Sequence, residues 1–261
     1  MERRLPTLTI AVLTLNEAEQ IEACLRSATF ADQLLVMDSG STDDTVLLAR
    51  NLGAEVHVSE DWQGFAVQRN RLIERSTSDW IFFLDADEVI PTELADEILH
   101  LIARDDTCVG DVAWLQVAFG QPLTHMRAGK GLPRLFPRRE LIRFEGVVHE
   151  GAVLHTPTAP HHTLKHRLEH HSRRTIHQSL LKLAQYAQLG AVKRMAAGKT
   201  GGVLRGTASA LASFVRQYVL ARGFLCGRAG FLHCFLVALE SFFRYAALAV
   251  DQAHLSKPAR R

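Results

Sequence analysis

Little net charge, few cysteines and the lack of a long charge-free apolar run limit what this 261-residue sequence encodes. Its four cysteines form no CxxC pair, which argues against a zinc ribbon or a redox dithiol and favours free thiols in a reducing compartment. The formal charge of +2 gives no sign of a nucleic-acid partner. The N-terminal apolar run is short, is interrupted by threonines and lacks a small-residue cleavage site, so a signal peptide is not expected.

Hydrophobic residues make up 47% of the chain, which is enough for a packed core. Short apolar runs at 7–15, 33–38, 54–58 and 79–87 predict strands. Helical patterns separate these runs, and a further helix is expected from Thr92. Such alternation is typical of βαβ units around a parallel sheet.

Acidic residues follow these predicted strands directly. Glu17, Asp38, Asp85 and Asp87 each stand just after an apolar run. The carboxyl ends of parallel strands lie along one edge of a sheet, so the pattern predicts a site there. Asp85 and Asp87 would repel each other without a cation, and Mg²⁺ or Mn²⁺ held by carboxylates and substrate phosphates resolves that conflict. A turn followed by the acidic start of a helix is the structural alternative for this stretch.

Four motifs carry a family resemblance. In order, TLTIAVLTLNEAEQIEACLRS, LLVMDSGSTDDT, DWQGFAVQRN and WIFFLDADEVI resemble the motifs of inverting nucleotide-sugar glycosyltransferases of family 2. DSGSTDDT together with WQGFAVQRN is most similar to the branch that includes the lipopolysaccharide core β-1,4-glucosyltransferases. The similarity covers nearly the whole chain. It implies an α/β fold of the GT-A type: a Rossmann-like, mostly parallel central sheet with flanking helices, followed by a C-terminal amphipathic helical region.

The resemblance also assigns site residues. Nucleotide-sugar contacts fall on Asn16, Glu17, Asp38, Arg69, Asn70 and Asp85. Within that set, Asp38 would bind the base, and Asp85 would bind the ribose or a metal-bound water. Asp87 would hold the Mg²⁺ or Mn²⁺ ion, with Asp85 beside it and His149 as a third ligand. A solvated helical charge is the alternative for Arg69.

Inverting transfer needs a base that takes the proton of the acceptor hydroxyl. Glu150, in GVVHEGAV, is the first choice, and it is grouped with Asp87 as catalytic. Many family members place the base in an acidic pair after the metal motif, and no Glu-Asp pair stands there in this chain. Asp111 and Glu145 therefore remain rivals, and a surface His-Glu pair without a catalytic role is the alternative at 149–150.

The last quarter of the chain differs in composition. Residues 203–250 carry five arginines and one acid, Glu240, among many large apolar residues. Each charge at a bilayer centre costs about 2.5–3.5 kcal/mol, so we expect helices lying in the interface of an anionic membrane rather than a span or a plain buried core. The histidines between 161 and 177 match no zinc ligand set and predict a basic surface. We predict a catalytic domain at 1–160 and a helical, membrane-facing and acceptor-facing region at 161–261.

The resemblance implies transfer of glucose from UDP-glucose to the inner core of lipopolysaccharide. The enzyme would be peripheral on the cytoplasmic face of the bacterial inner membrane. Its partners would be the nucleotide-sugar, the lipid-linked core acceptor and the membrane surface, with no nucleic acid. Arg127 and Lys130 stand where this branch has an aromatic-rich segment with an acid, and they fit a phosphorylated or Kdo-bearing acceptor.

Three alternatives remain open. A polyprenyl-phosphate glycosyltransferase would use the same donor site but more often carries clear spanning helices. A membrane adaptor would bind nucleotide-sugar or lipid without turnover. A nucleotidyltransferase usually opens with a glycine-rich phosphate loop, whereas LTLNEAEQ contains no glycine.

Overall fold

The computed structural model describes residues 4–104, 107–146 and 151–255, and they form two compact units. Unit 1 contains the residues up to Trp114 and Gly129–His170, whereas unit 2 contains Leu115–Ala128 and the residues from His171 onward. The chain therefore passes from one unit to the other three times. The predicted division of function at residue 160 stays a prediction.

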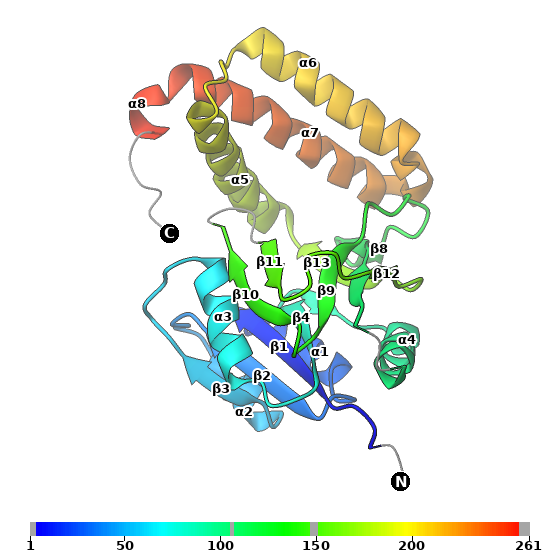
Figure 1. The fold of residues 1–261 in the computed structure, drawn as a ribbon. Coiled ribbons are helices and arrows are strands. Elements are labelled where there is room, and N and C mark those ends of the chain that lie inside the picture. Colours follow the sequence, from blue (N-terminus) through cyan, green and yellow to red (C-terminus); the bar gives the residue numbers. More distant parts are fainter. Residues whose placement is uncertain (1–3, 105–106, 147–150, 256–261) are drawn as a thin grey trace. The chain divides into compact units, whose positions relative to one another are not determined.

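Unit 1 is built on a seven-stranded sheet with the order β12-β6-β9-β4-β1-β2-β3 (Figure 1). Its strands are β1 (Leu8–Thr14), β2 (Gln33–Asp38), β3 (Glu55–Val58), β4 (Trp80–Asp85), β6 (Val109–Val112), β9 (Leu132–Pro137) and β12 (His161–Thr163). Strands β4, β1, β2 and β3 run parallel, and so do β12 and β6. Only β9 runs antiparallel to its neighbours β4 and β6 within this described sheet. The predicted fold class, a mostly parallel sheet with flanking helices, is confirmed.

Helices and two small strand pairs complete unit 1. The helices are α1 (Ile21–Ser27), α2 (Thr45–Asn51), α3 (Phe65–Arg75) and α4 (Thr92–Ala103). The remaining strands are β5 (Glu88–Val89), β10 (Leu141–Glu145), β11 (Gly151–Leu154) and β13 (Leu168–Arg173). β10 pairs with β11 as an antiparallel hairpin, and β5 pairs antiparallel with the first half of β13. Gly53 follows α2 with a φ of 79°, a left-handed conformation that glycine adopts easily at the end of a helix.

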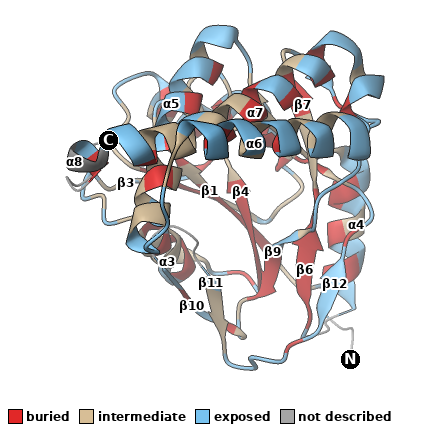
Figure 2. Cartoon of the chain, turned by 90° about the horizontal axis from the view of Figure 1, so that it is seen from above, coloured by how far each residue is buried: buried red, intermediate tan, exposed pale blue. Residues whose placement is uncertain are grey.

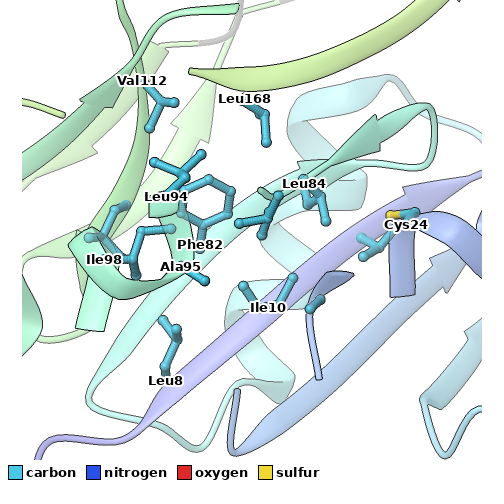
Figure 3. Packing of buried hydrophobic residues seen from close by; sticks show 14 of the residues in the cluster. Leu8, Ile10, Cys24, Phe82, Leu84, Leu94, Ala95, Ile98, Val112 and Leu168 are labelled. Carbon is cyan, nitrogen blue, oxygen red and sulfur yellow. The ribbon is translucent and has the colours of Figure 1, made fainter. Parts of the chain in front are cut away.

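The central strand β4 is buried on both faces, which explains its unbroken apolar sequence. Trp80, Phe82 and Leu84 point into one core with residues of α1 and α4, part of which is drawn in Figure 3. Ile81 and Phe83 point into a second core with residues of α3 and β10. Full burial of each such side chain contributes about 1.5–3 kcal/mol, so the strand end that carries Asp85 is rigidly anchored.

Unit 2 is mainly helical. It contains α5 (Ile176–Ala196), α6 (Val203–Phe214), the π-helical η1 (Val215–Leu220), the 3₁₀ turn η2 (Gly223–Cys226), α7 (Gly227–Val250) and α8 (Gln252–Leu255), with the short strands β7 (Trp114–Ala118) and β8 (Gln121–Pro122). Helices α5 and α6 both pack against α7 (Figure 1). The Thr175 side chain caps α5 by accepting a hydrogen bond from the N–H of Gln178 at 3.1 Å.

The apolar residues that recur at intervals of three and four along α5 are buried only in part. Leu183, Ala187 and Ala191 are buried, whereas Ile176 and Leu180 are 46% and 49% exposed. The buried face of α5 is therefore narrower than its apolar periodicity indicates.

Candidate functional site

The loops that follow β1 and β2 are bound to each other at the carboxyl edge of the sheet. Asn16 has a left-handed φ of 54°, and its side-chain oxygen accepts from the N–H of Thr42 at 2.8 Å. The N–H of Asn16 donates to the Ser41 hydroxyl at 2.8 Å, and that of Glu17 donates to the Thr45 hydroxyl at 2.8 Å. Asn16 and Glu17 thus lie beside the turn that begins at Asp38, another residue predicted to contact the nucleotide-sugar.

Asp38 is fully buried and organises this turn. Its Oδ1 accepts from the N–H groups of Gly40 and Ser41 at 2.9 and 2.8 Å, and its Oδ2 accepts from the Ser41 hydroxyl. Gly40, with a φ of 94°, supplies a backbone conformation that a residue with a Cβ rarely adopts. A direct contact of Asp38 with a nucleobase stays a prediction.

Asp85 ends β4 between two arginines. Nη2 of Arg134, on β9, lies 3.0 Å from Oδ2 of Asp85, and Nη2 of Arg69, on α3, lies 3.7 Å from Oδ1. The Arg69 guanidinium also lies over the rings of Phe83 and Phe144, at 5.8 and 5.3 Å from their centroids, so it is not a solvated helical charge. Burial alone would raise the pKa of Asp85, but the charges of Arg134 and Arg69 outweigh burial and lower it.

Glu88, the third carboxylate of this acidic stretch, lies inside unit 1 and is 0% exposed. It accepts from Nη2 of Arg134 and from Nε1 of Trp114, both at 2.6 Å, and from the N–H of Asp85 at 2.8 Å. Burial raises the pKa of Glu88 to about 7, although the charge of Arg134 opposes this rise. Glu88 and Arg134 together fix the position of Asp85, and no sequence motif predicts this role for either.

Asp87 faces a histidine that no sequence pattern connects with it. Nε2 of His170, on β13, lies 3.5 Å from Oδ2 of Asp87, and the two side chains are 18% and 15% exposed. The imidazole of His170 stacks on Trp114 with their centroids 4.6 Å apart. The prediction of an exposed basic histidine surface is therefore wrong for His170. Strands β13 and β5 pair with His170 opposite Glu88, and this register places the His170 side chain next to Asp87.

Asp87 and His170 together offer a carboxylate oxygen and an imidazole nitrogen, which are both common ligands of divalent cations. Asp85 is a poorer ligand because two guanidinium groups already compensate its charge. Among the residues that the structure describes, no group of three or more His, Cys, Asp or Glu side chains could hold a metal ion. Phosphate oxygens of a substrate would supply further ligands to a cation held by Asp87 and His170, as they commonly do for Mg²⁺.

Asn70 lies beside Arg69 but is used structurally. Its Nδ2 donates to the carbonyl of Phe144 at 3.1 Å, and its Oδ1 accepts from the N–H of Phe144 at 2.7 Å. This pair of hydrogen bonds ties α3 to β10. The contact of Asn70 with a donor stays a prediction.

The candidate bases differ in how they are placed. Asp111 lies 2.9 Å from Nδ1 of His161, and Glu145 accepts from Nε of Arg143 at 2.7 Å. The first choice, Glu150, and the predicted third metal ligand, His149, lie outside the described residues.

Comparisons with known proteins agree with these observations. Residues 9–151 match the family described as "Glycosyl transferase family 2". An uncharacterized glycosyltransferase of Rickettsia bellii is 28% identical over 254 residues, which cover 91% of this chain and 84% of that protein. The lipopolysaccharide core biosynthesis glycosyltransferase LpsC of Rhizobium meliloti is 26% identical over 268 residues, which cover 96% of this chain and 95% of LpsC.

A solved structure overlaps with a smaller part of the chain. It is glucosyl-3-phosphoglycerate synthase from Mycobacterium tuberculosis in complex with Mn²⁺, UDP and glucosyl-3-phosphoglycerate. It is 25% identical, covers 44% of this chain and 45% of its own, and superimposes with a TM-score of 0.36.

Proposed function

Because this chain belongs to glycosyl transferase family 2, we propose that it transfers a hexose with inversion from a nucleotide-sugar to a lipid-linked acceptor. The family confirms the sequence resemblance. We further propose that the donor is UDP-glucose and that the acceptor is the inner core of lipopolysaccharide. The name and the nearly full-length match of LpsC support this class of acceptor.

The observation that carries the proposal is the paired arrangement at the end of β4. Asp85 is oriented by Arg134 and Arg69, and Asp87 lies next to His170. A fold that kept nucleotide binding without turnover would have no need for this combination of a fixed carboxylate and a carboxylate–imidazole pair. The arrangement therefore favours an enzyme over a non-catalytic adaptor.

Each residue has a proposed part in the transfer. Asp87 and His170 would hold Mg²⁺ or Mn²⁺, which neutralises the charge of the diphosphate leaving group. Asp85, fixed by Arg134, would accept a hydrogen bond from the ribose. Glu150 would take the proton of the acceptor hydroxyl while that oxygen bonds to the anomeric carbon, and the bond from this carbon to the diphosphate breaks on the opposite face.

The acceptor class also sets the proposed place of the reaction. A lipid-linked core acceptor would bring the chain to the cytoplasmic face of the inner membrane as a peripheral protein. We propose that residues 1–160 bind the donor and that residues 161–261 face the membrane and the acceptor.

The metal proposal can be tested with purified protein, a panel of nucleotide-sugars and truncated core acceptors, with and without Mg²⁺ or Mn²⁺. Asp87→Ala should lower the transfer rate by about 100-fold or more, because it removes the charge that holds the cation. Asp96→Ala, an exposed acid on α4, is the matched control and should transfer like the wild type. Equal rates for Asp87→Ala and the wild type would refute the metal site.

The identity of the catalytic base and the competing functions are tested by separate experiments. Glu150→Gln should bind UDP normally and lose turnover, whereas unchanged turnover would move the role to Asp111 or Glu145. Adding polyprenyl phosphate to the acceptor panel tests the sister activity. Binding of donor without transfer to any acceptor would instead favour the adaptor.

A further inference from the structure

Small residues bring α6 and α7 close together over part of their interface, beside the ring contact of Phe214 with Phe231. Gly206 and Ser213 are the buried residues of α6, and a Cβ at Gly206 would lie 2.9 Å from the carbonyl oxygen of Phe242 on α7. Ser209 and Ser241 form a hydrogen bond across the interface, with their hydroxyl oxygens 2.7 Å apart. Close approach through glycine and hydroxyl side chains is typical of helix pairs in lipid. There, burial of large apolar side chains between helices gives no hydrophobic stabilisation, because the lipid tails are equally apolar.

Four large apolar residues of α6 and η1 lie on the exposed side of these helices, whereas Phe214 packs inward. Leu204, Leu211, Val215 and Val219 are 86%, 65%, 41% and 51% exposed. They recur at intervals of seven and four residues and therefore form one stripe, which we call the lipid face. Figure 2 shows α6 as mostly exposed. A helix in water places such residues inward, so the polarity of α6 is inverted.

Helix α7 is also more apolar and less buried than the core helix of a soluble protein. The segment Gly223–Val250 is the one helix among the described residues that is long and apolar enough to cross a membrane by length and composition. Only 28% of its most apolar window is buried. Glu240 and Arg244 form an ion pair within it, and burying them at a bilayer centre is costly. These charges favour a helix that lies along a membrane over one that crosses it.

The segment that carries the lipid face has exposed charges of one sign only. Between Val203 and Phe235 the sequence contains four arginines and no aspartate or glutamate. These are Arg205, Arg216, Arg222 and Arg228. No ion pair involves any of them in the part of the chain that the structure describes. A second copy of this chain would bring the same charges and be repelled, whereas anionic headgroups would neutralise them.

We propose that the lipid face lodges among the acyl chains of an anionic bilayer while the four arginines contact lipid phosphates. This inference deepens the proposed function and rests on it in one respect: the lipid-linked acceptor identifies which membrane the chain would bind. The surface itself follows from the inverted packing of α6 and the one-sided charge.

Flotation of the full chain with vesicles tests the proposal. The wild type should float with vesicles of phosphatidylcholine and phosphatidylglycerol, and Leu204→Gln/Leu211→Gln should bind at least about 10-fold more weakly. Both side chains are exposed, so an unchanged unfolding curve should verify that the variant folds. Leu47→Gln, an equally polar change at a 57% exposed leucine of α2, is the matched control and should bind like the wild type.

Charge reversal separates the two components of binding. Arg205→Glu/Arg216→Glu should weaken binding to the anionic vesicles by about 30-fold or more, because each basic residue near the surface contributes about 5-fold. Binding to phosphatidylcholine alone should change little. Flotation that survives both pairs of substitutions would refute the lipid face. So would a stable dimer that Leu211→Gln dissociates, in a protein that does not float.

Transfer to a soluble, delipidated core acceptor distinguishes the two proposals. If the leucine variant loses flotation but keeps this transfer, both proposals stand. If no variant and no wild-type sample transfers any sugar, while flotation still depends on Leu204 and Leu211, the proposed function fails and the lipid face stands.

Discussion

At the scale of single residues, the site depends on a buried cluster of charge. Arg134 is 4% exposed and bonds both Asp85 and Glu88, which leaves Asp85 fixed at the edge of the sheet. Trp114 contributes a further hydrogen bond to Glu88 and a ring 5.7 Å from the Arg134 guanidinium. Such a cluster makes the geometry of Asp85 specific, because Arg134 is the shared partner of two neighbouring carboxylates.

We expect Arg134→Gln to lower the free energy of unfolding by about 3–5 kcal/mol, because Glu88 would remain buried beside a second carboxylate without a counter-charge. Adding Glu88→Gln should recover part of that loss, with a coupling of about 1–3 kcal/mol between the two sites. Urea unfolding of the wild type, both single variants and the double variant measures the cycle. Strict additivity would contradict the cluster.

An exposed ion pair provides the control for this cycle. Arg143 and Glu145 are 52% and 56% exposed, so their pairing should contribute less than about 1 kcal/mol. A coupling of similar size in the two cycles would mean that burial does not matter at Arg134.

Residue roles were harder to predict than residue positions. Asp85 and Asp87 were predicted at the sheet edge because each follows an apolar run directly. The partnership of Glu88 with Arg134 spans 46 positions and has no periodic signal. His170 lies in a stretch rich in histidine, and its role differs from that of the neighbouring histidines only because β13 pairs with β5.

At the scale of elements, α4 is tied to the segment that precedes β13. Glu97 accepts from the N–H of Lys165 at 2.8 Å and from the N–H and Nδ1 of His166, each at 3.0 Å. Burial would raise the pKa of Glu97, but these hydrogen bonds outweigh burial and lower it. The carboxylate form therefore stabilises the junction.

We expect Glu97→Gln to destabilise the protein by about 1–3 kcal/mol at neutral pH, since the amide replaces a charged acceptor. A lowered pKa in the folded state gives stability that is present above the pKa of the unfolded chain and is lost as the pH falls through the folded value. The difference between wild type and variant should thus shrink on acidification below about pH 4. Urea unfolding across this range checks it, and a difference that does not depend on pH would assign the effect to packing.

The same scale shows which strands could be predicted. β1 to β4 lie in local βαβ units, so the order of these strands and of the helices between them can be predicted from the sequence. Strand β9 inserts antiparallel between β4 and β6, with Trp80 opposite Pro137. That placement depends on contacts between distant segments, and no local pattern encodes them.

At the scale of the whole molecule, the two units are interleaved along the chain. Residues 115–128 belong to unit 2 although unit 1 flanks them on both sides. Ala118, Leu123 and Met126 from this insertion form a core with Ala229 and Cys234 of α7. A single boundary at residue 160 is expected from the sequence, because no local pattern marks residues 115–128 as part of another unit.

This interleaving predicts how a shortened chain behaves. A chain ending at His170 would retain residues 115–128 but lose α7, leaving Leu123 and Met126 without the partners that bury them. Each loses about 1.5–3 kcal/mol of burial, so the insertion should become a preferred site of proteolysis while β1 to β4 stay protected. Mass spectrometry of limited digests measures this, with a chain ending at Leu255 as the control that keeps both units. Equal protection of residues 115–128 in the two chains would show that the insertion folds with unit 1 and needs no helical partner.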